Sequence, residues 1–136
     1  MRTAIAAALV ALLQAGLPMR TVDSGQSSQI DRAKQVSART ADEWTKLWTE
    51  HAGARTRPNV DFTKEVVAAV FFGSRPSAGY AVEIVRARQD GVALVVSYRE
   101  TRPAPDSVAA QVLTSPYHIV AISKGPTTDV KFERVE

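Results

Sequence analysis

Residues 66–72 read Val-Val-Ala-Ala-Val-Phe-Phe, with Glu65 before this stretch and Gly73 after it. A short continuous apolar run between a charge and a glycine is typical of a β-strand that is covered on both faces. The sequence therefore predicts a central strand over 66–72, with packing on each side of it.

A helix is predicted upstream of this strand, beginning after Thr40. The Thr40 hydroxyl can cap the first turn while Glu43 reaches back to the Thr40 amide. Three large apolar residues then recur at helical spacing and predict the face that packs on the core: Trp44, Leu47 and Trp48. The helix should end near Gly53, because glycine is common at helix C-termini.

A β-hairpin is predicted downstream of the central strand. The apolar segments 80–87 and 92–98 flank Asp90-Gly91, a dipeptide typical of hairpin turns. The residues around 74–79 form the turn that leads into this hairpin.

Two registers of this hairpin are compatible with the sequence. A two-residue turn at Asp90-Gly91 pairs Ala87 with Leu94, whereas one more loop residue pairs Ile84 with Val96. Both registers bring apolar side chains together, so both remain open.

The other segments complete an α+β fold. We expect a polar tether over 21–28, a short edge strand within 30–39, a loop over 101–107, a short strand over 111–114, and strands over 117–123 and 130–135. The predicted fold is a mainly antiparallel sheet of about five or six strands with one packed N-terminal helix.

The composition excludes several kinds of chemistry. The 136 residues include 17 Lys and Arg against 14 Asp and Glu, a net charge of +3, and the cations are spread along the chain. This pattern does not favour nucleic-acid binding. Because the chain has no cysteine, it can form no disulfide, thiolate nucleophile or zinc-thiolate site.

The N-terminus has the pattern of a secretory signal peptide. A single cation, Arg2, precedes an apolar stretch of about fifteen residues, shorter than the roughly 20 that a membrane-spanning helix needs. We expect residues 1–18 to be a signal peptide, 19–35 a polar tether or edge strand, and 36–136 one domain. The protein is expected to be exported to the periplasm or outside the cell, with no membrane span left after cleavage.

No catalytic or metal-binding motif is visible. The chain has two histidines, His51 and His118, and neither has a serine or carboxylate at a motif spacing, so a structural role is predicted for both. The segment 73–79 lacks the ending of a phosphate-binding loop. We therefore predict that the protein is not an enzyme and that it binds no metal or cofactor.

Two loops each place a glycine or proline directly before a tyrosine, and they are the candidates for binding a partner protein. The candidate residues are Ser77, Gly79, Tyr80, Pro116 and Tyr117. Rigid tyrosines supply contact area at low entropic cost. The alternative is that both tyrosines pack on the rim of the core.

Several of these motifs, in this order, resemble the C-terminal domain of the PrcB family: Trp44 with Trp48, Val60-Asp61-Phe62, Gly79-Tyr80 and Pro116-Tyr117. The resemblance extends over about residues 36–135. One departure is Ala78, where many relatives have a second glycine. The resemblance implies an exported domain that binds and stabilises a secreted protease.

A second resemblance is local. Residues 75–80 read Arg-Pro-Ser-Ala-Gly-Tyr and are similar to a loop of chagasin-type cysteine protease inhibitors. That family also uses a glycine-rich hairpin tip and an Arg-Pro-Trp loop, whereas Arg102-Pro103 is followed here by Ala104. An inhibitor, or a structural or ligand-binding envelope module, is the alternative to the accessory domain.

Overall fold

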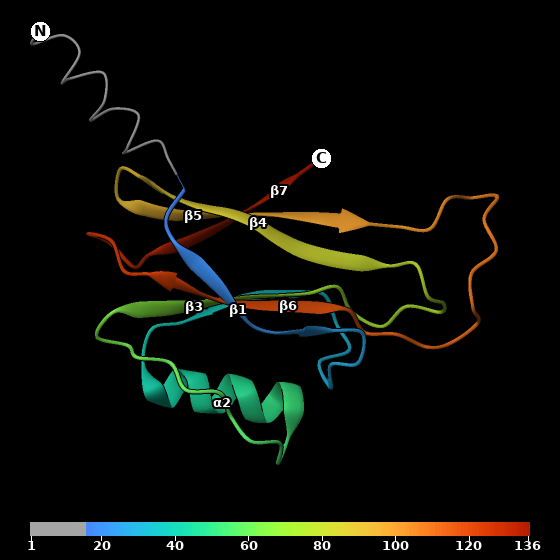
Figure 1. Ribbon diagram of the computed structural model, residues 1–136, viewed down its shortest axis with the longest axis horizontal. Coiled ribbons are helices and arrows are strands. Elements are labelled where there is room, and N and C mark those ends of the chain that lie inside the picture. The colour runs from blue at the N-terminus through green and yellow to red at the C-terminus, as the bar shows by residue number, and fades with distance from the viewer. Residues whose placement is uncertain (1–15) are drawn as a thin grey trace, which may run out of the picture.

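The computed structural model describes residues 16–136, which form one helix and seven strands (Figure 1). The strands are β1 (Met19–Gly25), β2 (Lys34–Ala38), β3 (Glu65–Phe71), β4 (Ala81–Asp90), β5 (Ala93–Thr101), β6 (Tyr117–Ser123) and β7 (Val130–Val135). The helix, α2, spans Ala41–Ala52. The predicted α+β class is confirmed, with more strands than expected and two sheets instead of one.

The molecule has three layers. One sheet has the strand order β1-β6-β3-β2 and the other has the order β4-β5-β7. The pairs are antiparallel except for β5 with β7, which run parallel. Helix α2 covers the outer face of the four-stranded sheet, and the three-stranded sheet covers its inner face (Figure 1).

Strand β3 lies in the middle layer and is buried on both faces, as predicted. Successive side chains leave a strand on opposite faces. Val67, Ala69 and Phe71 accordingly pack with α2, while Val66 and Val70 pack with the three-stranded sheet. The apolar run is unbroken because the side chains on each face of β3 pack in a hydrophobic core.

The predicted helix is confirmed. Thr40 Oγ1 accepts a hydrogen bond from the Glu43 N–H at 3.2 Å, although the Glu43 carboxylate accepts from the Arg39 N–H instead of the Thr40 amide. The three residues expected on the buried face, Trp44, Leu47 and Trp48, are buried, and His51 and Ala52 in the last turn are buried with them. The helix stops before Gly53, which has φ +62°. Capping and apolar spacing were therefore sufficient to place this element.

The polar tether predicted over 21–28 is wrong, because most of this segment belongs to β1. Strand β1 pairs with β6 along its length, from Met19 opposite Ile122 to Gly25 opposite Tyr117. An edge strand needs few apolar residues, since backbone pairing and alternate burial stabilise it. The edge strand expected within 30–39 is confirmed as β2.

The turn of the β4–β5 hairpin differs from both predicted registers. Asp90 pairs with Ala93, so the turn consists of Gly91 and Val92. Gly91 has φ +59°, a conformation that favours glycine. The dipeptide located the hairpin but misplaced its turn by one residue.

A bulge in β4 shifts the β4–β5 register by one residue along the hairpin. Ala87 pairs with Val96 and Ile84 with Tyr98, and the extra residue between these pairs is Val85. A bulge sets two residues of one strand against one of its partner. Because apolar pairing is possible on either side of it, the sequence pattern does not reveal it.

One predicted strand is absent. The strand expected over 111–114 is wrong: Thr114 forms an isolated bridge with Arg75, and the rest of the segment is irregular loop.

The expected signal peptide lies outside the described residues except for its last three. Of these, Leu17 donates its N–H to the Ala87 carbonyl at 2.7 Å. Within residues 16–136 no helix is long and apolar enough to cross a membrane.

Candidate functional site

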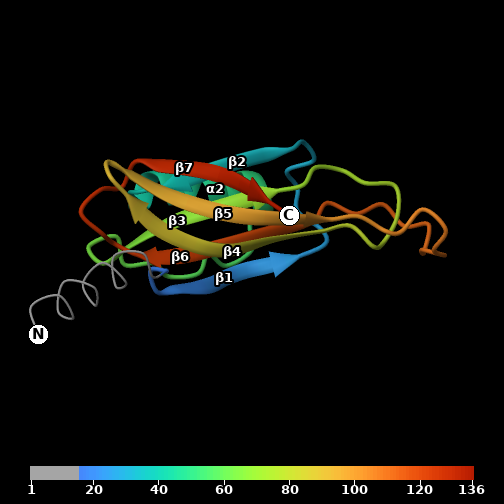
Figure 2. The same ribbon diagram turned by 90° about the horizontal axis from the view of Figure 1, so that it is seen from above.

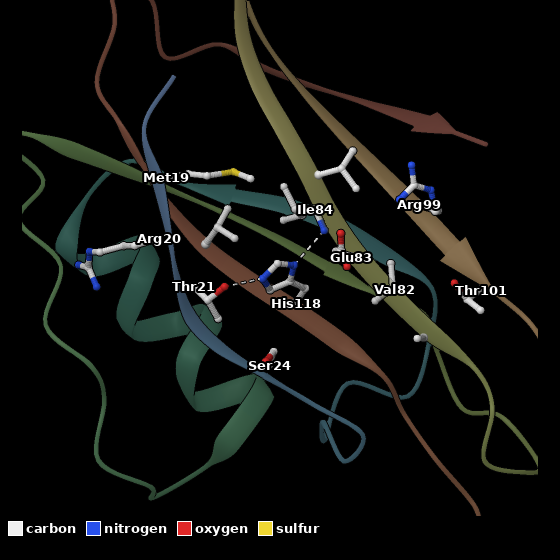
Figure 3. Close-up of a pocket in the computed structure, with 13 residues that line it drawn as sticks. Met19, Arg20, Thr21, Ser24, Val82, Glu83, Ile84, Arg99, Thr101 and His118 are labelled. Atoms are coloured by element: carbon white, nitrogen blue, oxygen red, sulfur yellow. Dashed lines mark hydrogen bonds between the residues drawn. The ribbon is translucent and has the colours of Figure 1, made fainter. Parts of the chain in front are cut away.

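An open concavity lies between the edge strands of the two sheets. Strands β1 and β4 are each the last strand of their sheet, and they lie along the same side of the molecule (Figure 2). Between them is an open groove of about 630 Å³. Its wall residues from β1, β4, β5 and β6 include Met19, Arg20, Thr21, Ser24, Val82, Glu83, Ile84, Arg99, Thr101 and His118 (Figure 3).

His118 bridges the two strands from the floor of this groove. Its Nδ1 accepts a hydrogen bond from the Ile84 backbone N–H at 2.8 Å, and its Nε2 lies 2.8 Å from Thr21 Oγ1 (Figure 3). Because Nδ1 must be unprotonated to accept from an N–H, Nε2 carries the proton and donates it to Thr21. The neutral imidazole therefore connects β1, β6 and β4.

The alternation of β6 explains why His118 occupies this position. Tyr117 and Ile119 point toward the helix, whereas Val120 and Ile122 point toward the three-stranded sheet. His118 shares the second direction, since residues two apart in a strand share a face. A polar residue thus stands where the pattern places apolar ones.

The groove has an uncharged floor and a charged rim. Burial lowers the pKa of His118 below its usual value, and the nearby Glu83 carboxylate opposes that shift. On the rim, Arg99 lies opposite Glu83 in the β4–β5 register. Arg20 forms an ion pair with Glu65 at 2.9 Å, which lowers the pKa of that carboxyl. Arg99 Nε donates to the Glu136 carbonyl at 3.1 Å, so both arginines have partners within the chain. The groove is therefore suited to backbone contacts more than to recognition of a charged ligand.

A second polar cluster is buried on the helix side of the four-stranded sheet. His51 Nδ1 lies 2.7 Å from Ser28 Oγ, and its Nε2 lies 2.9 Å from Asp23 Oδ2. Asp23 also accepts a hydrogen bond from the Tyr117 hydroxyl at 2.9 Å. Residues far apart in the sequence thus supply the serine and carboxylate that no motif spacing indicated.

The order Ser-His-Asp is that of an acyl-transfer triad, but the surroundings do not suit a nucleophile. Ser28 Oγ is buried and also accepts the Ile30 N–H at 3.0 Å, so a substrate carbonyl cannot approach it. Burial lowers the pKa of His51, although Asp23 acts in the opposite sense. The cluster therefore connects β1 to the end of α2, and the structural role predicted for His51 agrees with this arrangement.

The structure separates the five predicted partner-binding residues. Tyr117 and Pro116 are buried, and Tyr117 contacts His51 with ring centroids 4.2 Å apart. Ser77 is buried too, and its carbonyl accepts a hydrogen bond from Thr114 Oγ1 at 3.0 Å. In this conformation these three residues cannot contact a partner.

Gly79 and Tyr80 remain at the surface. Gly79 has φ +96°, and a Cβ placed on it would lie 2.9 Å from Pro103 Cβ. Tyr80 is half-buried and packs edge-on against Phe72, with ring centroids 5.6 Å apart. These contacts fix the loop that the chain forms before β4.

The loops of the inhibitor resemblance do not all meet. Arg75 and Arg102 both lie over the Phe72 ring, at 4.5 and 5.2 Å from its centroid, so the loops 72–80 and 102–116 run together. The β4–β5 hairpin tip lies at the opposite end of the molecule (Figure 1). Three loops at one end, as active-site occlusion would need, are not assembled here.

Sequence reasoning missed the residues of the groove. Thr21 and His118 are 97 positions apart, and Ile84 contributes only its backbone. The one usable signal was a histidine at an inward-facing position of β6. No group of three His, Asp or Glu residues that could hold a metal ion lies in the described part of the chain.

These features define a small α+β domain in which a helix backs two stacked sheets with a groove between their free edges. A family model described as PrcB C-terminal matches residues 66–123, and the family predicted from the sequence is thereby confirmed over this stretch. The match spans β3 to β6 and is shorter than the expected 36–135. No curated protein and no solved structure matches the chain.

Proposed function

We propose that the protein is an exported, non-enzymatic domain that binds another protein, and that this partner is a secreted or envelope protease that it stabilises. The observation that carries the proposal is the pair of free strand edges, β1 and β4, facing one groove. Backbone groups on a free edge can bind an extended segment of another protein.

Family membership supports the choice of partner. The matched stretch supplies one wall of the groove, β4, and its floor, β6. A PrcB C-terminal domain points to an accessory role beside a protease. The N-terminal sequence supports export, because Arg2 and the apolar residues after it have the pattern of a signal peptide.

The test compares two tryptophan variants of the full chain. Thr101 is exposed and lines the groove, so Thr101→Trp should fill it without disturbing either core. Lys131 is exposed on β7, the far edge of the same sheet, and Lys131→Trp is the matched control. Each tagged variant is expressed in the native host, and bound proteins are captured from envelope and secreted fractions and identified by mass spectrometry.

We expect one protease to be captured stoichiometrically by the parent chain and by Lys131→Trp, and to be depleted with Thr101→Trp. Adding the parent chain should lengthen the active lifetime of that protease without changing its initial rate. An immediate fall in turnover would support an inhibitor instead. Capture of no protease by any variant would refute the proposed partner.

A further inference from the structure

We infer that an extended segment of the partner adds to the outer edge of β4 at Ile84, and that the His118 ring occupies the place of that segment's carbonyl. This inference rests on the proposed function for the existence of a partner protein. It assigns the binding position, the kind of segment and the group that the segment must displace.

The backbone of β4 already forms hydrogen bonds away from β5. The Ile84 N–H donates to His118 Nδ1 at 2.8 Å, and the Ala87 carbonyl accepts from the Leu17 N–H at 2.7 Å. Neither partner belongs to a strand paired with β4. Both bonds have the lengths of strand pairing, so a side chain of β6 and the backbone just before β1 take the place of a neighbouring strand.

The position of the groove determines where a new segment fits. Val82 also lines the groove, and its backbone groups face the same side as those of Ile84, because residues two apart in a strand share an edge. Toward the other end, Leu17 already occupies the edge at Ala87. The accessible part of the edge therefore runs from Ala81 to Ile84.

The rim and floor indicate what kind of segment fits. Arg20 is paired with Glu65, and Arg99 Nε donates to the Glu136 carbonyl at 3.1 Å, so both rim cations already have partners within the chain. The floor beside His118 is apolar at Val120. We expect a short uncharged segment rich in β-branched residues, without proline where its N–H would pair with β4.

The His118 contact can be broken without a partner. A proton on Nδ1 would face the Ile84 N–H, so the bond exists only with the neutral ring. The polar and charged groups that line the groove with the ring are Thr21, Ser24 and Arg20 of β1, Glu83 of β4, and Arg99 and Thr101 of β5. Glu83 is the anion among them, and it favours protonation. Acid should therefore release the Ile84 N–H.

The first experiment uses the full chain alone. We expect the imidazole nitrogen shifts to report an Nδ1 acceptor at neutral pH, and exchange of the Ile84 amide with solvent to accelerate as the ring takes up a proton. A matched amide within β3, such as that of Ala68, should not change in the same pH range. A ring protonated on Nδ1 at neutral pH, or an Ile84 amide insensitive to this titration, would show that His118 does not hold the Ile84 N–H.

The second experiment uses a library of random ten-residue peptides displayed on phage as the probe. Selected peptides should slow amide exchange at Val82 and Ile84, and His118→Ala should strengthen their binding by about threefold to tenfold, the value of one hydrogen bond. Thr21→Val releases the ring from β1 and should act in the same direction if His118→Ala does not fold. Ser24→Trp, on the exposed wall of the groove, should abolish binding.

Selection of no peptide, or peptides that protect β2 or β7 instead, would overturn the inference. These outcomes are distinct from failure of the proposed function. A protease captured equally by the parent chain and Thr101→Trp would leave the partner in place and refute the groove. Peptides that bind at Ile84 while no protease is captured would support the groove as a binding site and refute the protease as the partner.

Discussion

His51 lies at the centre of the buried polar cluster on the helix side of the four-stranded sheet. It is buried among Ser28, Asp23 and Tyr117, and both of its ring nitrogens have partners. A buried polar group that loses its partner keeps its desolvation penalty without compensation. The contribution of His51 to stability is therefore expected to exceed that of its ring contacts alone.

His51→Phe should lower the free energy of unfolding by about 2 to 3 kcal/mol, because it leaves the Ser28 hydroxyl and part of the Asp23 carboxylate unpaired. Ser28→Ala should also cost about 2 kcal/mol, since two hydrogen bonds are lost and the Ile30 N–H and His51 Nδ1 are left unpaired. Urea denaturation checks both values. A His51→Phe variant as stable as the parent chain would show that the cluster contributes nothing to folding.

His118 and His51 should make stability depend on pH. Burial lowers the pKa of both below the ordinary value, so below that ordinary value the unfolded chain takes up protons more readily than the folded chain. Their contribution is complete above about pH 6.5 and is lost as the pH falls from there through the folded-state pKa values. Urea melts of the parent chain at pH 7.5 and 5.5 should show lower stability in acid.

His118→Gln should weaken this acid dependence, because the amide oxygen can accept from Ile84 without titrating. His51 remains in that variant and should retain part of the effect. If the two chains lose the same stability between pH 7.5 and 5.5, His118 is not the buried neutral base that the geometry describes.

At the scale of elements, the turns carry backbone conformations that few residues adopt. Gly73 follows β3 with φ +92°, and a Cβ on it would lie 2.9 Å from the Ala33 nitrogen. Gly91 in the hairpin has φ +59°, with nothing near a Cβ. The two glycines therefore separate backbone strain from steric conflict.

Gly91→Ala should cost about 1 kcal/mol, the price of the left-handed conformation alone. Gly73→Ala should cost more, about 2 kcal/mol or above, because β3 must also move away from the segment that precedes β2. Thermal and urea unfolding of both variants check the order. Equal losses of stability in the two variants would mean that the backbone around Gly73 accommodates a Cβ without a further energetic cost.

Leu17 links the start of β1 to β4 and packs against the core between the sheets. Leu17→Ala should lower stability by about 1 kcal/mol, since this side chain is half-buried. Val92→Ala, at an exposed hairpin position, is the control and should change little. No loss of stability with Leu17→Ala would show that this contact does not stabilise the packing of β1 against β4.

At the scale of the whole molecule, the sequence predicted the elements better than their assembly. The capping residues of α2, the unbroken apolar run of β3 and the glycine of the hairpin are local signals, and they located their elements. Division into two sheets depends on pairing between distant strands, such as β1 with β6, for which a polar edge strand gives no local sign.

The candidate site was not predictable in the same way. Its centre is a side chain on β6 that meets a backbone group on β4 and a hydroxyl on β1. The predicted Tyr117 is inward-facing because strand alternation points it toward α2, opposite to His118. Distinguishing the two faces of β6 requires knowing that α2 covers one of them and the three-stranded sheet the other.

The central claim is that a partner protein occupies the groove between β1 and β4. The most direct measurement places a photo-reactive side chain at Thr101 in the groove and, separately, at Lys131 on β7, and irradiates cells that express each full chain. We predict that Thr101 crosslinks to one protein, a protease, and that Lys131 does not. A protease crosslinked only through Lys131, or no crosslink through Thr101, would contradict the account.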